Sequence, residues 1–243
     1  MPRPPIHLFT DFGTGGPWLG QMQAVIASIA PGVQVINLLA DAPLSRPRPA
    51  AYLLEACVRD IPADAVFCCV VDPGVGSGRG VLVVETESGR FVGPDNGLLS
   101  RVAGAGASVR EVRWRPAALS GSFHGRDLFA PVAAMLANGS SVETSHLDRG
   151  DMVGAEWPAS LAEVIYIDHF GNAMTGLHAG DLLADEAIGI GDREVFQART
   201  FYEVPTGQAF WYVNSLGLIE IAVNLGRADR QLDLAVGSPI TVV

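Results

Sequence analysis

The fold of this chain is decided by Val70-Val71-Asp72-Pro73-Gly74-Val75-Gly76-Ser77-Gly78-Arg79-Gly80, a glycine-rich segment between two apolar runs. These runs, 65–71 and 81–84, have the length and composition of buried strands. Pro73 fixes one backbone torsion and the glycines permit left-handed conformations, so the segment can turn sharply. An acid therefore ends a buried strand, and Arg79 follows it in the same loop. The segment is either a tight turn with a solvated acid or a loop built around a ligand.

Strand and helix patterns alternate on both sides of this loop. Such alternation indicates a parallel or mixed sheet that is covered by helices. The expected strands are Ile6–Thr10, Val33–Leu38, Ala65–Val71, Val81–Glu85, Arg90–Val92 and Val109–Trp114. The expected helices are Trp18–Ala30, Ala50–Ile61, Gly97–Val102 and Gly125–Leu136.

The pattern changes in the last third of the chain, where short strands are separated only by turns. A smaller all-β, barrel-like domain is typical of this pattern. We therefore predict an α/β N-terminal domain with a mainly parallel sheet over residues 1–155, followed by a β-rich domain over residues 156–243. The expected strands of the second domain are Val164–Ile167, Glu194–Ala198, Ala209–Val213, Leu218–Ala222 and Ile240–Val243.

Composition and charge exclude several classes of partner. The formal net charge is −10, so the chain repels a phosphate backbone and nucleic acid is not an expected partner. Hydrophobic residues make up 49% and charged residues 17%, which favours a homo-oligomer with buried subunit faces.

No apolar run approaches the length of about 20 residues that spans a membrane. The first residues lack the apolar core of a signal peptide, so we expect a cytoplasmic protein.

Cysteine spacing argues against a metal site. Cys57, Cys68 and Cys69 all lie in apolar runs, and their number is odd. Neighbouring residues of a strand point to opposite faces, so Cys68 and Cys69 are poorly placed to share one ion. We expect buried, reduced thiols and no bound metal.

Acidic side chains follow two of the predicted strands. Asp11 comes directly after the first strand and Asp72 after the third. Ligands of open α/β sheets bind beyond the carboxyl ends of the strands, so these carboxylates are candidate ligand contacts. His124 precedes another expected helix and is a third candidate. The alternatives are that Asp11 caps a helix and that His124 is structural.

The other polar turns are less specific. The alternating glycines of the 72–80 loop fit neither the dinucleotide nor the P-loop spacing, so a phosphate cradle is not expected. Asp95 and Asn96 begin the expected helix at 97–102, and capping alone would explain them. Two hairpin tips of the β-rich half, 168–172 and 214–217, carry polar side chains, and the first also carries Phe170. As isolated turns they are unremarkable, but polar groups beside an aromatic residue could read a base edge.

Taken in order, these segments carry a resemblance to a known family. They are Thr10-Asp11-Phe12-Gly13, Val71-Asp72-Pro73-Gly74-Val75-Gly76, Arg79, Pro94-Asp95-Asn96-Gly97-Leu98-Leu99, Phe123-His124-Gly125-Arg126-Asp127, Asp168-His169-Phe170-Gly171-Asn172 and Asn214-Ser215. The set resembles the S-adenosyl-L-methionine (SAM) hydrolases that form adenosine, also called SAM hydroxide adenosyltransferases, which are relatives of the SAM-dependent fluorinase and chlorinase. Each motif is weak alone, but the ordered set spans nearly the whole chain.

The resemblance implies a larger α/β domain, a smaller β-barrel domain and a homotrimer with active sites between subunits. It implies that water or hydroxide displaces L-methionine from the 5′ carbon of SAM, which gives adenosine. SAM would be the substrate, and no cofactor would be needed. Asp72, Arg79 and His124 would form the hydrolytic triad.

The same resemblance assigns the binding residues. Asp11 would hold the ribose hydroxyls, and Asp168 would contact the methionine amine. Phe170 would stack on adenine and Asn172 would hydrogen-bond to it. The remaining expected substrate contacts are Asp95, Asn96, Asn214 and Ser215, the last at the methionine end.

Two other functions compete with hydrolysis. The halogenases resemble this chain but carry tyrosines at the positions of Asp72 and His124, and an anionic Asp72 would repel a halide. A non-catalytic SAM or adenosine sensor would need no water-activating group. Two departures from the relatives affect methionine contacts: Gly15-Gly16-Pro17-Trp18 lacks an acid before the proline, and Leu216 replaces the arginine of the halogenases.

Overall fold

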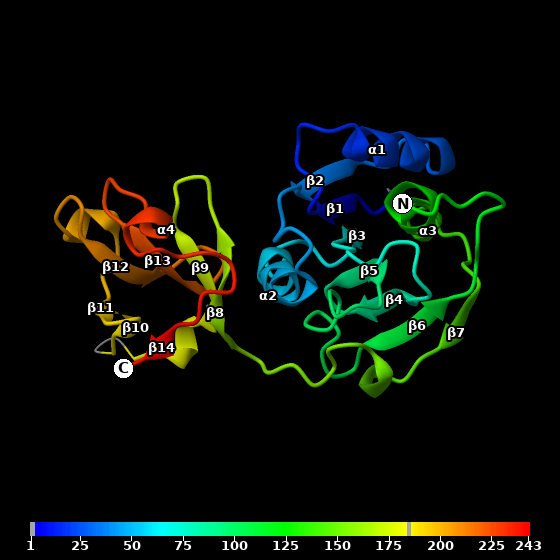
Figure 1. The fold of residues 1–243 in the computed structure, drawn as a ribbon. Coiled ribbons are helices and arrows are strands. Elements are labelled where there is room, and N and C mark those ends of the chain that lie inside the picture. The colour runs from blue at the N-terminus through cyan, green and yellow to red at the C-terminus, as the bar shows by residue number, and fades with distance from the viewer. Residues whose placement is uncertain (1–2, 184–185) are drawn as a thin grey trace. The chain divides into compact units, whose positions relative to one another are not determined.

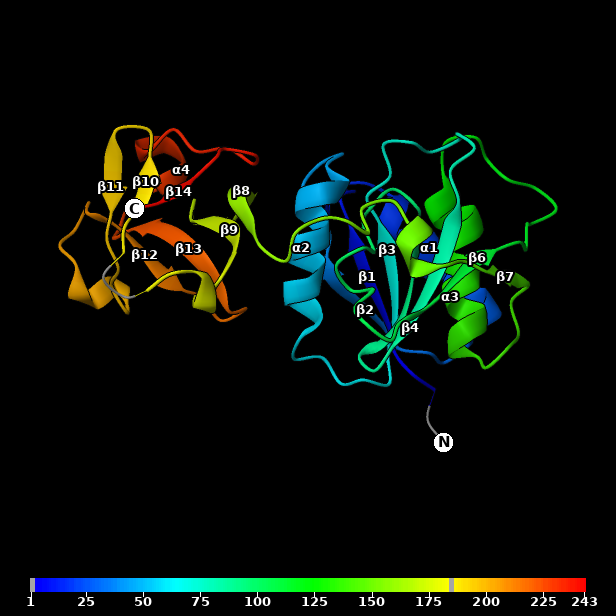
Figure 2. The same ribbon diagram turned by 90° about the horizontal axis from the view of Figure 1, so that it is seen from below.

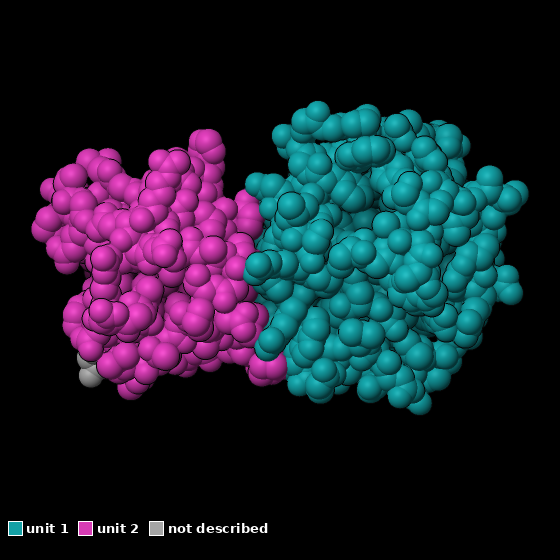
Figure 3. Space-filling model, in the orientation of Figure 1, with its two compact units in different colours: residues 1–157 teal, residues 158–243 magenta. Residues whose placement is uncertain are grey.

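The computed structural model describes residues 3–183 and 186–243. The chain divides into two compact units, residues 1–157 and residues 158–243 (Figure 3). Unit 1 contains all the helices of eight or more residues that the described residues form, and unit 2 is built mainly from short strands (Figure 1). The predicted order of an α/β domain followed by a β-rich domain is confirmed.

A seven-stranded mixed sheet forms the centre of unit 1, in the order β2-β1-β3-β5-β4-β6-β7. The first four of these strands run parallel to one another, and the last three continue the sheet in antiparallel fashion. The strands are β1 (Ile6–Thr10), β2 (Val35–Leu39), β3 (Val66–Val70), β4 (Val81–Thr86), β5 (Gly89–Pro94), β6 (Ser108–Val112) and β7 (Thr144–His146).

Helices cover both faces of this sheet (Figure 2). α1 (Trp18–Ile29) and α3 (Ala130–Ala137) pack on one face, where their apolar side chains share a core with the inward-facing residues of β1 and β3. α2 (Pro47–Val58) lies on the other face. Because β1 and β3 are buried on both faces, their side chains are apolar except for His7 and Thr10 of β1.

The ligand edge of the sheet is set by the pairing of β1 with β3. These strands are parallel neighbours in a register that places Thr10 opposite Val70. Their carboxyl ends therefore lie side by side, and the acids that follow them, Asp11 and Asp72, emerge at the same edge. The sequence analysis predicted the position of both acids beyond the carboxyl ends of strands, and the direct pairing of β1 with β3 is an observation of the structure.

Unit 2 contains two antiparallel sheets. One has the order β12-β13-β9-β8 and the other β11-β10-β14. Side chains from both sheets share an apolar core. The strands are β8 (Leu161–Ile167), β9 (Ala173–His178), β10 (Ile188–Ile190), β11 (Arg193–Val195), β12 (Ala209–Val213), β13 (Leu218–Val223) and β14 (Thr241–Val242), and a short helix, α4 (Ala228–Gln231), follows β13.

The predicted helix at 97–102 is wrong, because this segment forms consecutive turns. Gly97 has φ +96°, which lies outside the helical region, and its carbonyl accepts a turn hydrogen bond from Ser100 N at 3.0 Å. The side chain of Asn96 accepts from Leu98 N at 3.2 Å, so it caps a turn rather than a helix.

Other boundaries differ by a few residues. The predicted helix at 125–136 begins with a π-helical turn, Gly125–Phe129, before α3. β9 was missed because Gly176 interrupts its apolar pattern; a Cβ at Gly176 would lie 2.6 Å from the Cβ of Leu161, so the glycine permits close approach to β8. No helix in the described ranges is long and apolar enough to cross a membrane.

Candidate active site

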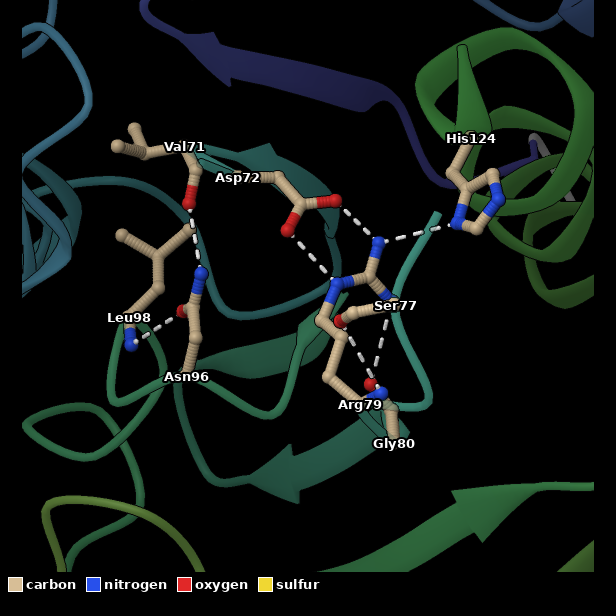
Figure 4. A network of polar contacts seen from close by, with 8 residues as sticks. All are labelled: Val71, Asp72, Ser77, Arg79, Gly80, Asn96, Leu98 and His124. Carbon is tan, nitrogen blue, oxygen red and sulfur yellow. Dashed lines mark hydrogen bonds and ion pairs between the residues drawn. The ribbon is translucent and has the colours of Figure 1, made fainter. Parts of the chain in front are cut away.

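The loop between β3 and β4 holds an ion pair that is largely shielded from solvent (Figure 4). Arg79 Nε donates to Asp72 Oδ1 at 2.7 Å, and Arg79 Nη2 donates to Asp72 Oδ2. The side chains of Arg79 and Asp72 retain only 9% and 5% of their accessible surface. Two parallel hydrogen bonds fix the carboxylate more strictly than a single contact can. The loop is therefore built around its acid, and the interpretation as an idle turn with a solvated acid is wrong.

His124 extends this pair into a triad. Its Nδ1 lies 3.2 Å from Arg79 Nη2, and the residue sits at the start of the π-helical turn before α3 (Figure 4). Arg79 Cζ lies over the ring of Phe129, from the same turn, at 5.0 Å from the ring centroid, so the aromatic face contacts the guanidinium. Burial and the positive charge of Arg79 both lower the pKa of His124, so the neutral imidazole is favoured.

Asp11 and His124 face a common cavity of about 80 Å³ at the carboxyl ends of β1 and β3. Asp11 Oδ2 accepts a hydrogen bond from Ser45 N at 2.9 Å. Burial raises the pKa of Asp11, while this backbone hydrogen bond opposes the shift. The lining residues are Asp11, Phe12, Ser45, Val70, Asp72, Val75, Ser122, Phe123, His124 and Gly125.

Asp95 and Asn96 are predicted site residues that do not line this cavity. Asn96 Nδ2 donates to Val71 O at 2.9 Å and so holds the residue that precedes Asp72 (Figure 4). Asp95 accepts from Val153 N at 3.0 Å. The side chain of Asn96 therefore supports the backbone beside the loop, and that of Asp95 holds the segment around Val153.

A second, larger pocket of about 870 Å³ lies in unit 2. It brings together five residues that were predicted as substrate contacts, from two hairpin tips that are far apart in the sequence. Its lining includes Asp168, Phe170, Asn172, Asn214 and Ser215. Phe170 is 71% exposed, so the face of its ring is available for stacking.

The turn between β8 and β9 is fixed by its own polar groups. Asp168 accepts from Asn172 N at 2.8 Å and from Asn172 Nδ2 at 3.0 Å. An ion pair clamps the turn from outside, because Arg227 Nη1 donates to His169 O at 2.9 Å while its other nitrogens bind Asp229. Phe170 at the tip is thereby held on a rigid support.

The turn between β12 and β13 is organised by Asn214. Its Oδ1 accepts from the backbone N–H groups of Leu216 and Leu218, at 2.9 and 3.1 Å. Its Nδ2 donates to Glu220 Oε2 at 2.6 Å. Asn214 therefore shapes the loop, and Ser215 at the tip is exposed to the pocket.

The predicted site residues did not include six polar residues that line these cavities: Ser45, Ser122, Tyr212, Glu220, Asn224 and Arg227. Glu220 left a signal, because it is a lone acid in the apolar strand β13. Ser45 left none, since its contact with Asp11 depends on a left-handed backbone, φ +55°, that serine rarely adopts. No group of three or more His, Cys, Asp or Glu side chains in the described part of the chain is placed to hold a metal ion.

Two models of one protein family match this chain, one after the other along its sequence. A model of the SAM hydroxide adenosyltransferase N-terminal domain matches residues 6–146, and a model of the C-terminal domain of the same family matches residues 162–241. Proteins named (R)-S-adenosyl-L-methionine hydrolase from Salinispora arenicola and Thermus thermophilus are each 37% identical, covering 98% of this chain and 97% and 99% of theirs.

Solved structures resemble nearly the whole chain. The crystal structure of an uncharacterized conserved protein from Thermotoga maritima superimposes with a TM-score of 0.87 at 32% identity, covering 98% of this chain and 99% of that one. With both family models matched in order and similarity over nearly the full length, the chain belongs to the SAM hydroxide adenosyltransferase family.

Proposed function

We propose that this protein is an enzyme that hydrolyses SAM to adenosine and L-methionine, the activity for which its relatives are named. The observation that carries the proposal is the triad of Asp72, Arg79 and His124 at the ligand edge of unit 1. We further propose that the substrate is the sulfonium epimer that the relatives' names specify, and that no cofactor takes part.

The chemistry requires little acid catalysis. The sulfonium makes methionine a neutral leaving group, so the C5′–S bond can break with its electron pair passing to sulfur. Water supplies the new O–C5′ bond and loses one proton. The difficult part is to hold that water in line with the breaking bond, a positioning effect worth up to about 7–11 kcal/mol in favourable cases.

The triad is suited to this task. Each Asp72 oxygen accepts one hydrogen bond from Arg79 and keeps a lone pair that can accept another from water. The positive charge of Arg79 favours hydroxide over water beside it. Proton transfer and orientation by such side chains contribute about 10²–10⁴-fold to a rate. We assign Asp72, Arg79 and His124 to the nucleophilic water.

The remaining site residues are assigned to binding. Asp11, beside the same cavity, would hold the ribose hydroxyls. In unit 2, Phe170 would stack on adenine with Asn172 at its edge, and Asp168 would contact the methionine amine. We propose a homotrimer with its sites between subunits, a state that light scattering after size exclusion can measure.

The test is hydrolysis of SAM in water enriched in ¹⁸O. The expected result is equimolar adenosine and methionine, with the label in the 5′ hydroxyl of adenosine. A variant Asp72→Asn should bind SAM but form no product. Unchanged SAM after binding would favour a sensor, and 5′-haloadenosine at raised halide would favour a halogenase; either result would overturn the proposal.

A further inference from the structure

Glu220 is a buried acid that none of the preceding steps uses. It lies on β13, the strand between β12 and β9, and is only 2% exposed. The register places it directly opposite Tyr212 on β12 and Met174 on β9. Glu220 also lines the large pocket of unit 2. Its carboxylate therefore lies beneath the groups that we assign to substrate binding.

Three hydrogen-bond donors converge on this carboxylate. Asn214 Nδ2 donates to Oε2 at 2.6 Å, and the Tyr212 hydroxyl and the Asn172 amide also donate to it. Asn172 belongs to the turn that carries Phe170, whereas Asn214 belongs to the turn that carries Ser215. One side chain thus connects the two turns that form the pocket wall.

These contacts fix the orientation of both amides. Asn214 uses Oδ1 for its own loop and Nδ2 for Glu220. The amide nitrogen of Asn172 serves both Asp168 and Glu220, which leaves its Oδ1 as an acceptor. Without Glu220, each amide would lose one of the contacts that fix its orientation, and the carbonyl that Asn172 offers to a ligand would depend on the hydrogen bond to Asp168 alone.

We propose that Glu220 is a positioning residue for substrate binding, one that holds Asn172 and Asn214 in the orientations that receive the adenosyl and methionine groups. This inference rests on the proposed function. A buried carboxylate is costly unless donors compensate it, so an apolar residue would serve a purely structural role in this strand better. The convergence of donors from both pocket turns indicates that the acid serves the pocket.

The charge of Glu220 gives the proposal a distinctive signature. Burial raises the pKa of Glu220, against the hydrogen bonds from Asn214, Tyr212 and Asn172 and with the negative charge of Asp168. Protonation of Glu220 replaces one acceptor site by a donor, so its hydrogen bonds to Asn172, Asn214 and Tyr212 weaken as the pH falls. The KM for SAM should therefore rise toward acidic pH, whereas the pH dependence of kcat is set by His124 of the triad.

The experiment compares Glu220→Gln with the wild type over pH 5 to 8, measuring kcat and KM separately. Removing a charged hydrogen-bond acceptor should raise KM about tenfold or more near pH 7.5 and leave kcat nearly unchanged. The acidic rise in KM should be smaller in the variant. The matched control is Glu194→Gln, the same change at an exposed position on β11, which should behave as the wild type.

Other outcomes overturn the inference. A folded Glu220→Gln protein with the wild-type KM, or with an unaltered pH dependence of KM, excludes a positioning role. If that variant does not fold, Tyr212→Phe removes one hydrogen-bond donor to Glu220 with little change in volume. A KM for this variant equal to that of the wild type would then contradict the positioning role of Glu220. If the wild type forms no adenosine, the proposed function fails separately, and calorimetric adenosine binding by the same variants tests Glu220.

Discussion

Arg79 Nη2 lies 3.2 Å from His124 Nδ1, and this contact determines where the imidazole proton resides. A guanidinium group can only donate, so Nδ1 must accept the hydrogen bond. Neutral His124 therefore carries its proton on Nε2 and presents an N–H donor at its other nitrogen. A protonated ring would instead turn an N–H group toward the guanidinium. His124 thus orients the nucleophilic water by donating a hydrogen bond to the water oxygen, and Asp72 accepts the proton that the water loses.

This arrangement predicts an acidic limit to activity. The pKa of His124 is lowered below its ordinary value of 6.5, so the active neutral form is present at neutral pH and is lost as the pH falls through that lowered value. The unfolded chain binds this proton more readily, so acidification also lowers the free energy of unfolding. In a plot of the logarithm of kcat against pH, we expect an acidic limb below pH 6.5, along which kcat falls as the pH is lowered. A limb centred above pH 7 would contradict the assigned tautomer.

Arg79→Lys should inactivate the enzyme although it keeps the charge. An ammonium group cannot make the two parallel hydrogen bonds to Asp72 and also reach His124. We expect kcat to fall about 10²–10⁴-fold, the range for a disrupted proton-transfer group, with SAM binding retained. Single-turnover assays and calorimetry separate these effects. Arg113→Lys, at an exposed ion pair with Glu111, is the matched control and should retain wild-type kcat.

Much of unit 1 could be predicted because its signals are local. Strand 65–71 is a continuous apolar run, and parallel strands deliver their following residues to one edge, so Asp11 and Asp72 could be placed together. The segment 97–102 could not be predicted. Its apolar spacing fits a helix. However, Gly97 takes a left-handed conformation, and the side chain of Asn96 hydrogen-bonds to the backbone of Val71 and of Leu98.

The site was predicted less evenly than the fold. Residues in polar turns, such as Asp168 and Ser215, stand out in the sequence because turns carry function. Ser45 does not stand out, and Glu220 does so only as a lone acid in an apolar strand, because the roles of both depend on partners from other strands and loops. A lone acid in an apolar strand should prompt a search for its donors, and this search would have found Glu220.

The conformation of the β3–β4 loop can be tested at one glycine. Gly76 has φ +82°, and a Cβ there would lie 2.4 Å from Gly121 O, in the segment that precedes His124. Gly76→Ala should destabilise unit 1 by about 1–3 kcal/mol and lower kcat, because the loop must shift away from the histidine. Gly78→Ala is the control in the same loop, since nothing lies within 4 Å of its Cβ position. Thermal unfolding and kcat should distinguish the two; equal effects would contradict the close approach.

Phe170→Ala tests the assignment of the unit 2 pocket to the adenine base. Stacking of one base on an aromatic side chain contributes about 1–3 kcal/mol, and the 71% exposed ring of Phe170 has little packing of its own to lose. We therefore expect the KM for SAM to rise by the factor to which the loss of this stacking free energy corresponds. The kcat and the unfolding temperature should stay close to those of the wild type. Phe196→Ala is the matched control, because Phe196 is 60% exposed in the same unit but does not line the pocket. If both variants raise KM equally, or if Phe170→Ala lowers kcat alone, the ring does not stack on the base and the adenine must bind elsewhere.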